Sequence, residues 1–213
     1  MTVPQPISRE KVDAMSHKRS RYLLLALILA APLALIGSGA MAIYTGLYGI
    51  AADDPHTQPV FWLLQTVRNR SIAARATDTV PTDLSDPRRI ASGAAEYDEM
   101  CSSCHLAPGM ERTEISRGLY PRAPELRRGS PLTAAEQFWV VKHGIKMTGM
   151  AAWGVTHDDE SLWDIVAFLR KMPELTAEQY KELVKSAPKT HSKMMQDMQM
   201  EGSHAHDDDP KSQ

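Results

Sequence analysis

The only two cysteines of the chain, Cys101 and Cys104, are separated by two serines, and a histidine follows directly, giving the sequence CSSCH. A disulfide between residues this close would close almost no loop, so it would remove little entropy from the unfolded chain. A structural zinc site usually has two such pairs, or one pair and two spaced histidines, and no second cysteine pair exists. A thioredoxin-like redox motif would need alternating strands and helices around it, which this sequence does not show. The sequence therefore favours neither a structural disulfide, nor a zinc site, nor a thioredoxin-like redox motif for these cysteines.

The remaining interpretation of CSSCH is attachment of a haem. In a C-x-x-C-H motif, two thiols add to the vinyl groups of the haem and the adjacent histidine binds the iron. The motif therefore predicts one covalently bound haem c, held by Cys101, Cys104 and His105. A five-residue match can arise by chance, so the rest of the sequence decides whether CSSCH is a haem site.

That context begins with a long apolar segment. From Tyr22 to Ala52 the sequence has 31 residues without a charge, and a helix of this length would exceed the hydrocarbon thickness of about 30 Å of a bilayer. Basic residues precede the segment and Asp53 and Asp54 follow it, so the positive-inside rule places the amino terminus in the cytoplasm. The sequence predicts a single-pass protein of the cytoplasmic (inner) membrane of a bacterium, with CSSCH on the periplasmic side.

The alternative is a cleaved signal peptide, because "AMA" at residues 40–42 resembles a small-residue cleavage site. The apolar sequence continues beyond this site, which favours an uncleaved anchor. In either case the CSSCH motif is exported.

Helical patterns dominate the rest of the chain and alternating strand patterns are hard to find, so the predicted fold class is mainly α. The predicted organisation has six parts: a cytoplasmic amino terminus (1–21), a transmembrane anchor (22–52), a connector with an amphipathic helix (53–85), a globular domain (86–174), a C-terminal helix (175–188) and a tail rich in Met and His (189–213). The connector helix is expected either to lie on the membrane surface or to pack on the globular domain, and packing is favoured.

Residues 86–173 resemble a class I c-type cytochrome domain, both in CSSCH and in the order of the motifs around it. In that family a glycine and an aromatic residue on the first helix pack against the last helix, and Gly93 and Tyr97 match this pattern. The resemblance implies that they pack against Trp163, Val166 and Phe168. It also implies that the carbonyl of Pro108, in "CHLAPG", accepts the second ring N–H of His105, a contact that would fix the orientation of the ring.

The family usually supplies a methionine as the sixth ligand of the iron, from a loop before the last helix. Met150 in "GMAAW" matches this position best, although Ala151 replaces the usual proline and leaves the loop less rigid. Met147 is the second choice, and His143 and His157 are further alternatives.

These features predict an electron carrier rather than an enzyme, because two axial ligands leave substrate no ready access to the iron. The carrier is either a free relay or a subunit of a dehydrogenase or oxidase complex. Its expected partners are the membrane, through the N-terminal helix, and redox proteins such as an oxidase, a dehydrogenase or another cytochrome. The net charge of −2 gives no reason to expect nucleic acid. A haem enzyme with a labile sixth ligand is one alternative.

The other alternative is a copper-handling protein, and it rests on the tail. By composition the tail is expected to be a disordered, solvated end. It nevertheless combines thioethers suited to Cu(I) with imidazoles suited to Cu(II). The candidate copper ligands are His191, Met194, Met195, Met198, Met200, His204 and His206.

Overall fold

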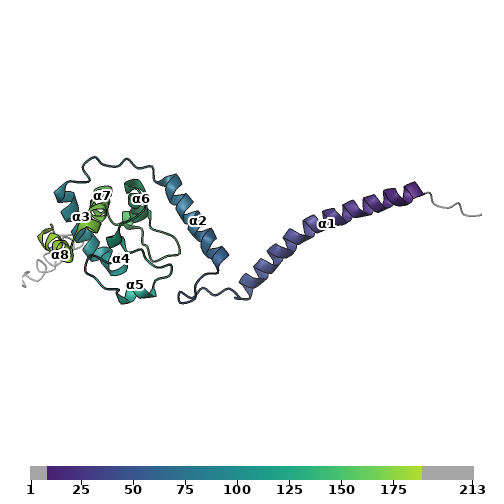
Figure 1. The fold of residues 1–213 in the computed structure, drawn as a ribbon, viewed down its shortest axis with the longest axis horizontal. Coiled ribbons are helices and arrows are strands. Elements are labelled where there is room, and N and C mark those ends of the chain that lie inside the picture. Colours follow the sequence, from purple (N-terminus) through teal and green to yellow (C-terminus); the bar gives the residue numbers. More distant parts are fainter. Residues whose placement is uncertain (1–8, 189–213) are drawn as a thin grey trace, which may run out of the picture. The chain divides into compact units, whose positions relative to one another are not determined.

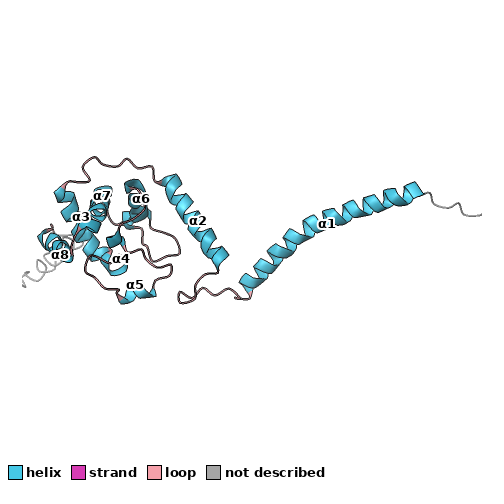
Figure 2. Ribbon diagram, in the orientation of Figure 1, coloured by secondary structure: helices cyan, strands magenta, loops and turns pink. Residues whose placement is uncertain are grey.

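A computed structural model describes residues 9–188, and within that range every regular element is a helix (Figures 1 and 2). The α-helices are α1 (Arg9–Tyr44), α2 (Gln58–Arg75), α3 (Pro87–Met100), α4 (Ser102–His105), α5 (Glu114–Gly118), α6 (Ala134–His143), α7 (Asp159–Lys171) and α8 (Ala177–Ser186). The described residues also form three 3₁₀ turns: η1 (Leu126–Arg128), η2 (Trp153–Val155) and η3 (Met172–Glu174). The chain divides into two compact units, residues 1–51 and 52–213.

The first unit is built around α1. Among the described residues α1 contains the one segment, Lys18–Tyr44, whose 27 residues are long and apolar enough to cross a membrane. The helix starts earlier and ends sooner than the uncharged stretch of the sequence. It stops at Tyr44 because the chain turns at Gly46, which has a φ of 68°, a conformation that favours glycine.

The second unit contains the globular domain, whose centre is the crossing of α3 and α7 (Figure 1). Gly93 lies against the backbone of α7 at Asp164. The Tyr97 and Phe168 rings are 5.2 Å apart between centroids, so Gly93 and Tyr97 pack against the last helix of the domain as expected. Trp163 also belongs to this core, and it stacks on Phe138 of α6 with the ring centroids 4.0 Å apart.

Two further helices lie on this pair. α6 contributes Phe138 and Val141 to the buried core, and α8 is fixed to α3 by a hydrogen bond of 2.5 Å from the Tyr180 hydroxyl to Asp98. α8 falls inside the range predicted for a C-terminal helix. Most helices of the domain begin with a side chain that accepts a hydrogen bond from the first turn, which stabilises each of them by about 1 kcal/mol. These caps are Asp86, Thr113, Thr133, Asp158 and Thr176.

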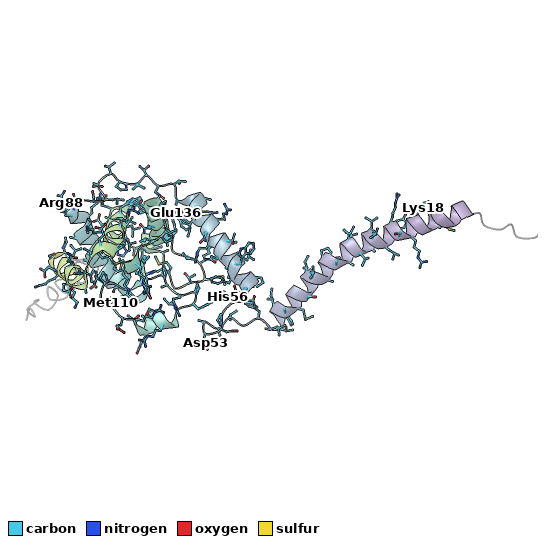
Figure 3. All side chains as sticks on the ribbon, in the orientation of Figure 1. Lys18, Asp53, His56, Arg88, Met110 and Glu136 are labelled. Atoms are coloured by element: carbon cyan, nitrogen blue, oxygen red, sulfur yellow. The ribbon has the colours of Figure 1, made fainter. Side chains whose placement is uncertain are left out.

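Helix α2, in the connector, packs on the domain through its C-terminal half. It lies against α6, and Ile72 is 4% exposed. His56 lies just before its start (Figure 3). The backbone N–H of His56 donates to the Tyr120 hydroxyl at 3.0 Å, and the two rings meet edge to face. The connector helix therefore packs on the globular domain, which was the favoured alternative.

Candidate functional site

The CSSCH segment forms a single tight turn of helix at the end of α3. Cys101 ends α3, and the backbone N–H of His105 donates to the Cys101 carbonyl at 2.9 Å. The chain then leaves α4 at Leu106, whose φ of 61° is unusual for a residue with a side chain. A buried hydrogen bond of 2.6 Å from the Tyr97 hydroxyl to the Leu106 carbonyl holds this turn in place. Tyr97, which lies on α3 one helix turn before Cys101, thus fixes this turn.

Both cysteines carry free thiols. The Cys101 thiol is buried. Burial, together with smaller effects of the neighbouring Cys104 and Glu96, raises its pKa to about 12. A buried sulfur next to a carboxylate is more stable as a neutral group than as a thiolate. A thioether is neutral at every pH, so this surrounding suits a sulfur that has been alkylated.

The His105 ring is oriented by a backbone carbonyl, but not by the one expected. Nδ1 of His105 lies 2.9 Å from the carbonyl oxygen of Pro124, so the prediction that Pro108 accepts this hydrogen bond is wrong. The physical reason is that a helical side chain leans toward the amino terminus of its helix, away from the residues that follow it. Pro108 follows His105 by three residues and lies in the turn closed by Ala107 and Met110.

The bond to Pro124 also determines which nitrogen of His105 is available. Burial lowers the pKa of His105, while the bond to the Pro124 carbonyl acts in the opposite direction and is the smaller effect. The neutral ring is therefore favoured. Because its proton is placed on Nδ1 by Pro124, the lone pair on Nε2 is left for a metal.

The segment between α6 and η2 carries both candidate methionines, and the structure separates them. Met150 is half-buried and packs against the hydrophobic core, whereas Met147 is 96% exposed. Hydrogen bonds close this segment around Met150: Ile145 N–H to the Met150 carbonyl at 3.2 Å, and Met150 N–H to the Thr148 hydroxyl at 3.1 Å. These hydrogen bonds order the loop, which has Ala151 where the family usually has a proline.

The two sides of the site meet at Gly149. A Cβ on Gly149 would lie 2.6 Å from a methyl group of Leu119, so the backbone beside Met150 packs tightly on the segment that leads to Pro124. The loop that presents Met150 and the loop that orients His105 are thereby in contact. The donor set of two thiols, one imidazole with a free Nε2 and one thioether fits a haem c.

The alternative histidine ligands have other neighbours. The ring of His143 lies 5.0 Å from that of Trp139 between centroids. His157 packs edge to face on Trp153, and its Nε2 is 3.9 Å from Oε2 of Glu96 on α3, with both side chains less than 8% exposed. This buried acid and imidazole pair was missed from the sequence, because its members are far apart in the chain and match no motif.

Within residues 9–188 no group of three or more His, Cys, Asp or Glu side chains is placed to hold a metal ion. The candidate copper ligands of the tail, His191, Met194, Met195, Met198, Met200, His204 and His206, lie outside the described residues. Copper binding there stays a prediction.

Comparison with known proteins identifies the domain. Residues 88–169 match the family model described as cytochrome c oxidase, cbb3-type, subunit III. No curated protein and no solved structure matches the chain. The matched range runs from the first turn of α3 to the last turn of α7 and includes CSSCH and Met150. Residues 88–169 of this chain are therefore a class I c-type cytochrome domain, a member of a family whose cofactor is haem c.

Proposed function

We propose that this protein is a membrane-anchored monohaem cytochrome c that transfers electrons between redox proteins at the outer face of the cytoplasmic membrane. The observation that carries the proposal is the arrangement around His105. Its ring is oriented by Pro124, the two thiols of CSSCH lie on the same turn, and the loop with Met150 contacts the loop with Pro124.

Each of these residues has a separate task. Cys101 and Cys104 would bind the haem covalently as thioethers, and Nε2 of His105 and the sulfur of Met150 would bind its iron. The haem supplies a one-electron couple between Fe(II) and Fe(III). The Pro124 carbonyl holds the His105 ring and raises its basicity as a ligand.

If His105 and Met150 both bind the iron, a carrier is favoured over an enzyme. Substrate needs an open coordination position, and a thioether held by an ordered, half-buried loop does not readily leave it. The packing of Met150 on the core therefore supports outer-sphere electron transfer. A haem enzyme with a labile sixth ligand is the less favoured alternative.

The membrane anchor rests on α1. Lys18, Arg19 and Arg21 precede an apolar helix that is long enough to span a bilayer. We infer that this helix is retained, with the cytochrome domain on the periplasmic side. A cleaved signal peptide ending at Ala42 is the alternative, and it exports the same domain.

The partners follow from the family. The matching family is that of an oxidase subunit, so we infer that this chain delivers electrons to a membrane-bound oxidase, as a subunit or as a relay. The charges of residues 86–174 nearly balance, with 11 Lys and Arg against 13 Asp and Glu, and thus favour no strongly charged partner.

The proposal is tested on the full chain purified from membranes in mild detergent. Acidified organic solvent should leave the haem with the denatured polypeptide, and a redox titration should show one reversible one-electron step. The ferrous protein should not bind carbon monoxide rapidly. Haem that leaves with the solvent rules out covalent attachment, and rapid carbon monoxide binding rules out a carrier with six filled coordination positions.

A further inference from the structure

Helix α2 has two faces, and its contacts with the domain determine which one points outward. Ile72 is buried where α2 packs on α6, and the backbone N–H of His56, just before the helix, donates a hydrogen bond to Tyr120. The helix is thus attached to the cytochrome domain at both ends. Its position on the domain is fixed, and so is the face that remains uncovered.

The uncovered face is apolar. Trp62, Leu63 and Val67 are 66%, 54% and 58% exposed. Helical spacing places Leu63, Val67 and Arg70 on one face, with Trp62 at the edge of that face. We call these four residues the outer face of α2. Large apolar side chains exposed next to one another, rather than singly, indicate a surface that binds another apolar phase.

The charges of α2 fit the surface of a lipid bilayer. The helix contains three arginines, Arg68, Arg70 and Arg75, and no acidic residue. Arginine together with tryptophan and leucine on one helix is the composition of segments that lie in the headgroup layer of a bilayer, where the cations meet anionic lipid. The nearest acidic residues before the helix, Asp53 and Asp54, lie in the loop that precedes it.

The length of that loop keeps α2 close to the membrane. If α1 spans a bilayer, as proposed above, residues 45–57 connect its end to the first residue of α2. These thirteen residues reach at most about 45 Å when fully extended. The tether therefore holds the outer face near lipid at a high effective concentration, which no diffusing protein partner has.

We propose that the outer face of α2 lies in the headgroup layer of the membrane that holds α1, with Trp62, Leu63 and Val67 toward the acyl chains and Arg70 at the phosphates. Because α2 is packed on α6, this contact fixes the orientation of the whole cytochrome domain on the bilayer. The CSSCH turn would then be presented to redox partners in one orientation rather than tumbling with the domain on a tether. This inference rests on the proposed membrane anchor.

The test uses the full chain in vesicles of phosphatidylcholine and phosphatidylglycerol. Once both native cysteines carry haem, an introduced cysteine is the only free thiol. Leu63→Cys and Val67→Cys probe the outer face. Val155→Cys, at a residue of η2 that is 84% exposed, is the matched control. All three are reacted with a charged, membrane-impermeant maleimide at less than one protein per vesicle.

We expect the cysteines at 63 and 67 to react several-fold more slowly than the cysteine at 155. Trp62→Glu, combined with Val67→Cys, should restore fast reaction while the haem spectrum stays unchanged. If 63 and 67 react as fast as 155 in protein that resists alkaline carbonate washing, the docking inference is overturned and the anchor stands. Protein that washes off overturns the anchor itself. Protection that appears only at high protein density indicates contact between copies, and also overturns the inference.

Discussion

The backbone of Gly93 lies so close to α7 that an ideal Cβ on it would be 1.9 Å from the carbonyl oxygen of Asp164. No real Cβ tolerates such a distance, and the obstacle is backbone rather than a side chain that can rotate away. The close crossing of α3 and α7 therefore depends on glycine at this position. Because α3 leads directly into Cys101, the same crossing positions the CSSCH turn.

Gly93→Ala should lower the free energy of unfolding by about 2 kcal/mol or more, because α3 and α7 must separate to admit the methyl group. Denaturant unfolding of the haem-loaded protein measures this loss. Gly118→Ala is the matched control, since a Cβ at Gly118 meets nothing within 4 Å; its effect should stay within about 0.5 kcal/mol. Equal effects of the two substitutions would contradict a close crossing at Gly93.

Much of this crossing could be predicted from the sequence, because Gly93, Tyr97 and CSSCH lie within 13 residues of one another and share one helix pattern. Helices are local structures, and local spacing determines which of their faces are apolar. The partner of His105 could not be predicted in the same way. Pro124 reaches the ring only after the chain has passed through α5, so the choice between Pro108 and Pro124 depends on tertiary structure.

Arg89 is the centre of an ion-pair cluster between α3 and α7. Its guanidinium contacts Asp83 at 2.8 Å, Glu160 at 2.6 Å and Asp164 at 2.6 Å, and its side chain is only 14% exposed. Arg89→Met should lower the free energy of unfolding by about 2 kcal/mol at neutral pH, because the half-buried Asp164 loses its cation. Arg88→Met is the control. Its side chain is 92% exposed, and within residues 9–188 its ion pair is with Asp86, so the free energy of unfolding should hardly change.

The deficit of Arg89→Met should shrink as the pH falls. Burial already raises the pKa of Asp164 despite Arg89, and removing the arginine raises it further. A carboxyl whose pKa is raised in the folded state stabilises that state at low pH, and this contribution is lost as the pH rises through the folded pKa. Unfolding measured across the acidic range should therefore bring variant and parent closer together. A deficit that stays constant with pH would assign the loss to packing rather than to Asp164.

The bond between His105 and Pro124 has its own test. In the diamagnetic ferrous protein, the Nδ1 proton of His105 should exchange slowly with solvent, because the Pro124 carbonyl accepts it at 2.9 Å. Pro124→Ala keeps a carbonyl but loosens the loop, so exchange followed by NMR should accelerate by about tenfold, the equivalent of roughly 1.4 kcal/mol. Pro108→Ala should leave the rate unchanged. The opposite result would restore Pro108 as the partner.

The distal ligand distinguishes a carrier from an enzyme most directly. Met150 packs on the core within a segment closed by its own hydrogen bonds, whereas Met147 is exposed with a φ of 57°. Met150→Leu should abolish the near-infrared charge-transfer band of the ferric protein, open the ferrous iron to carbon monoxide and lower the reduction potential, since a methionine ligand raises it. Met147→Leu has the same volume change and serves as the control, with band and potential unchanged. Loss of the band in Met147→Leu alone would move the ligand to Met147, and a parent protein without the band would favour the enzyme with a labile sixth position.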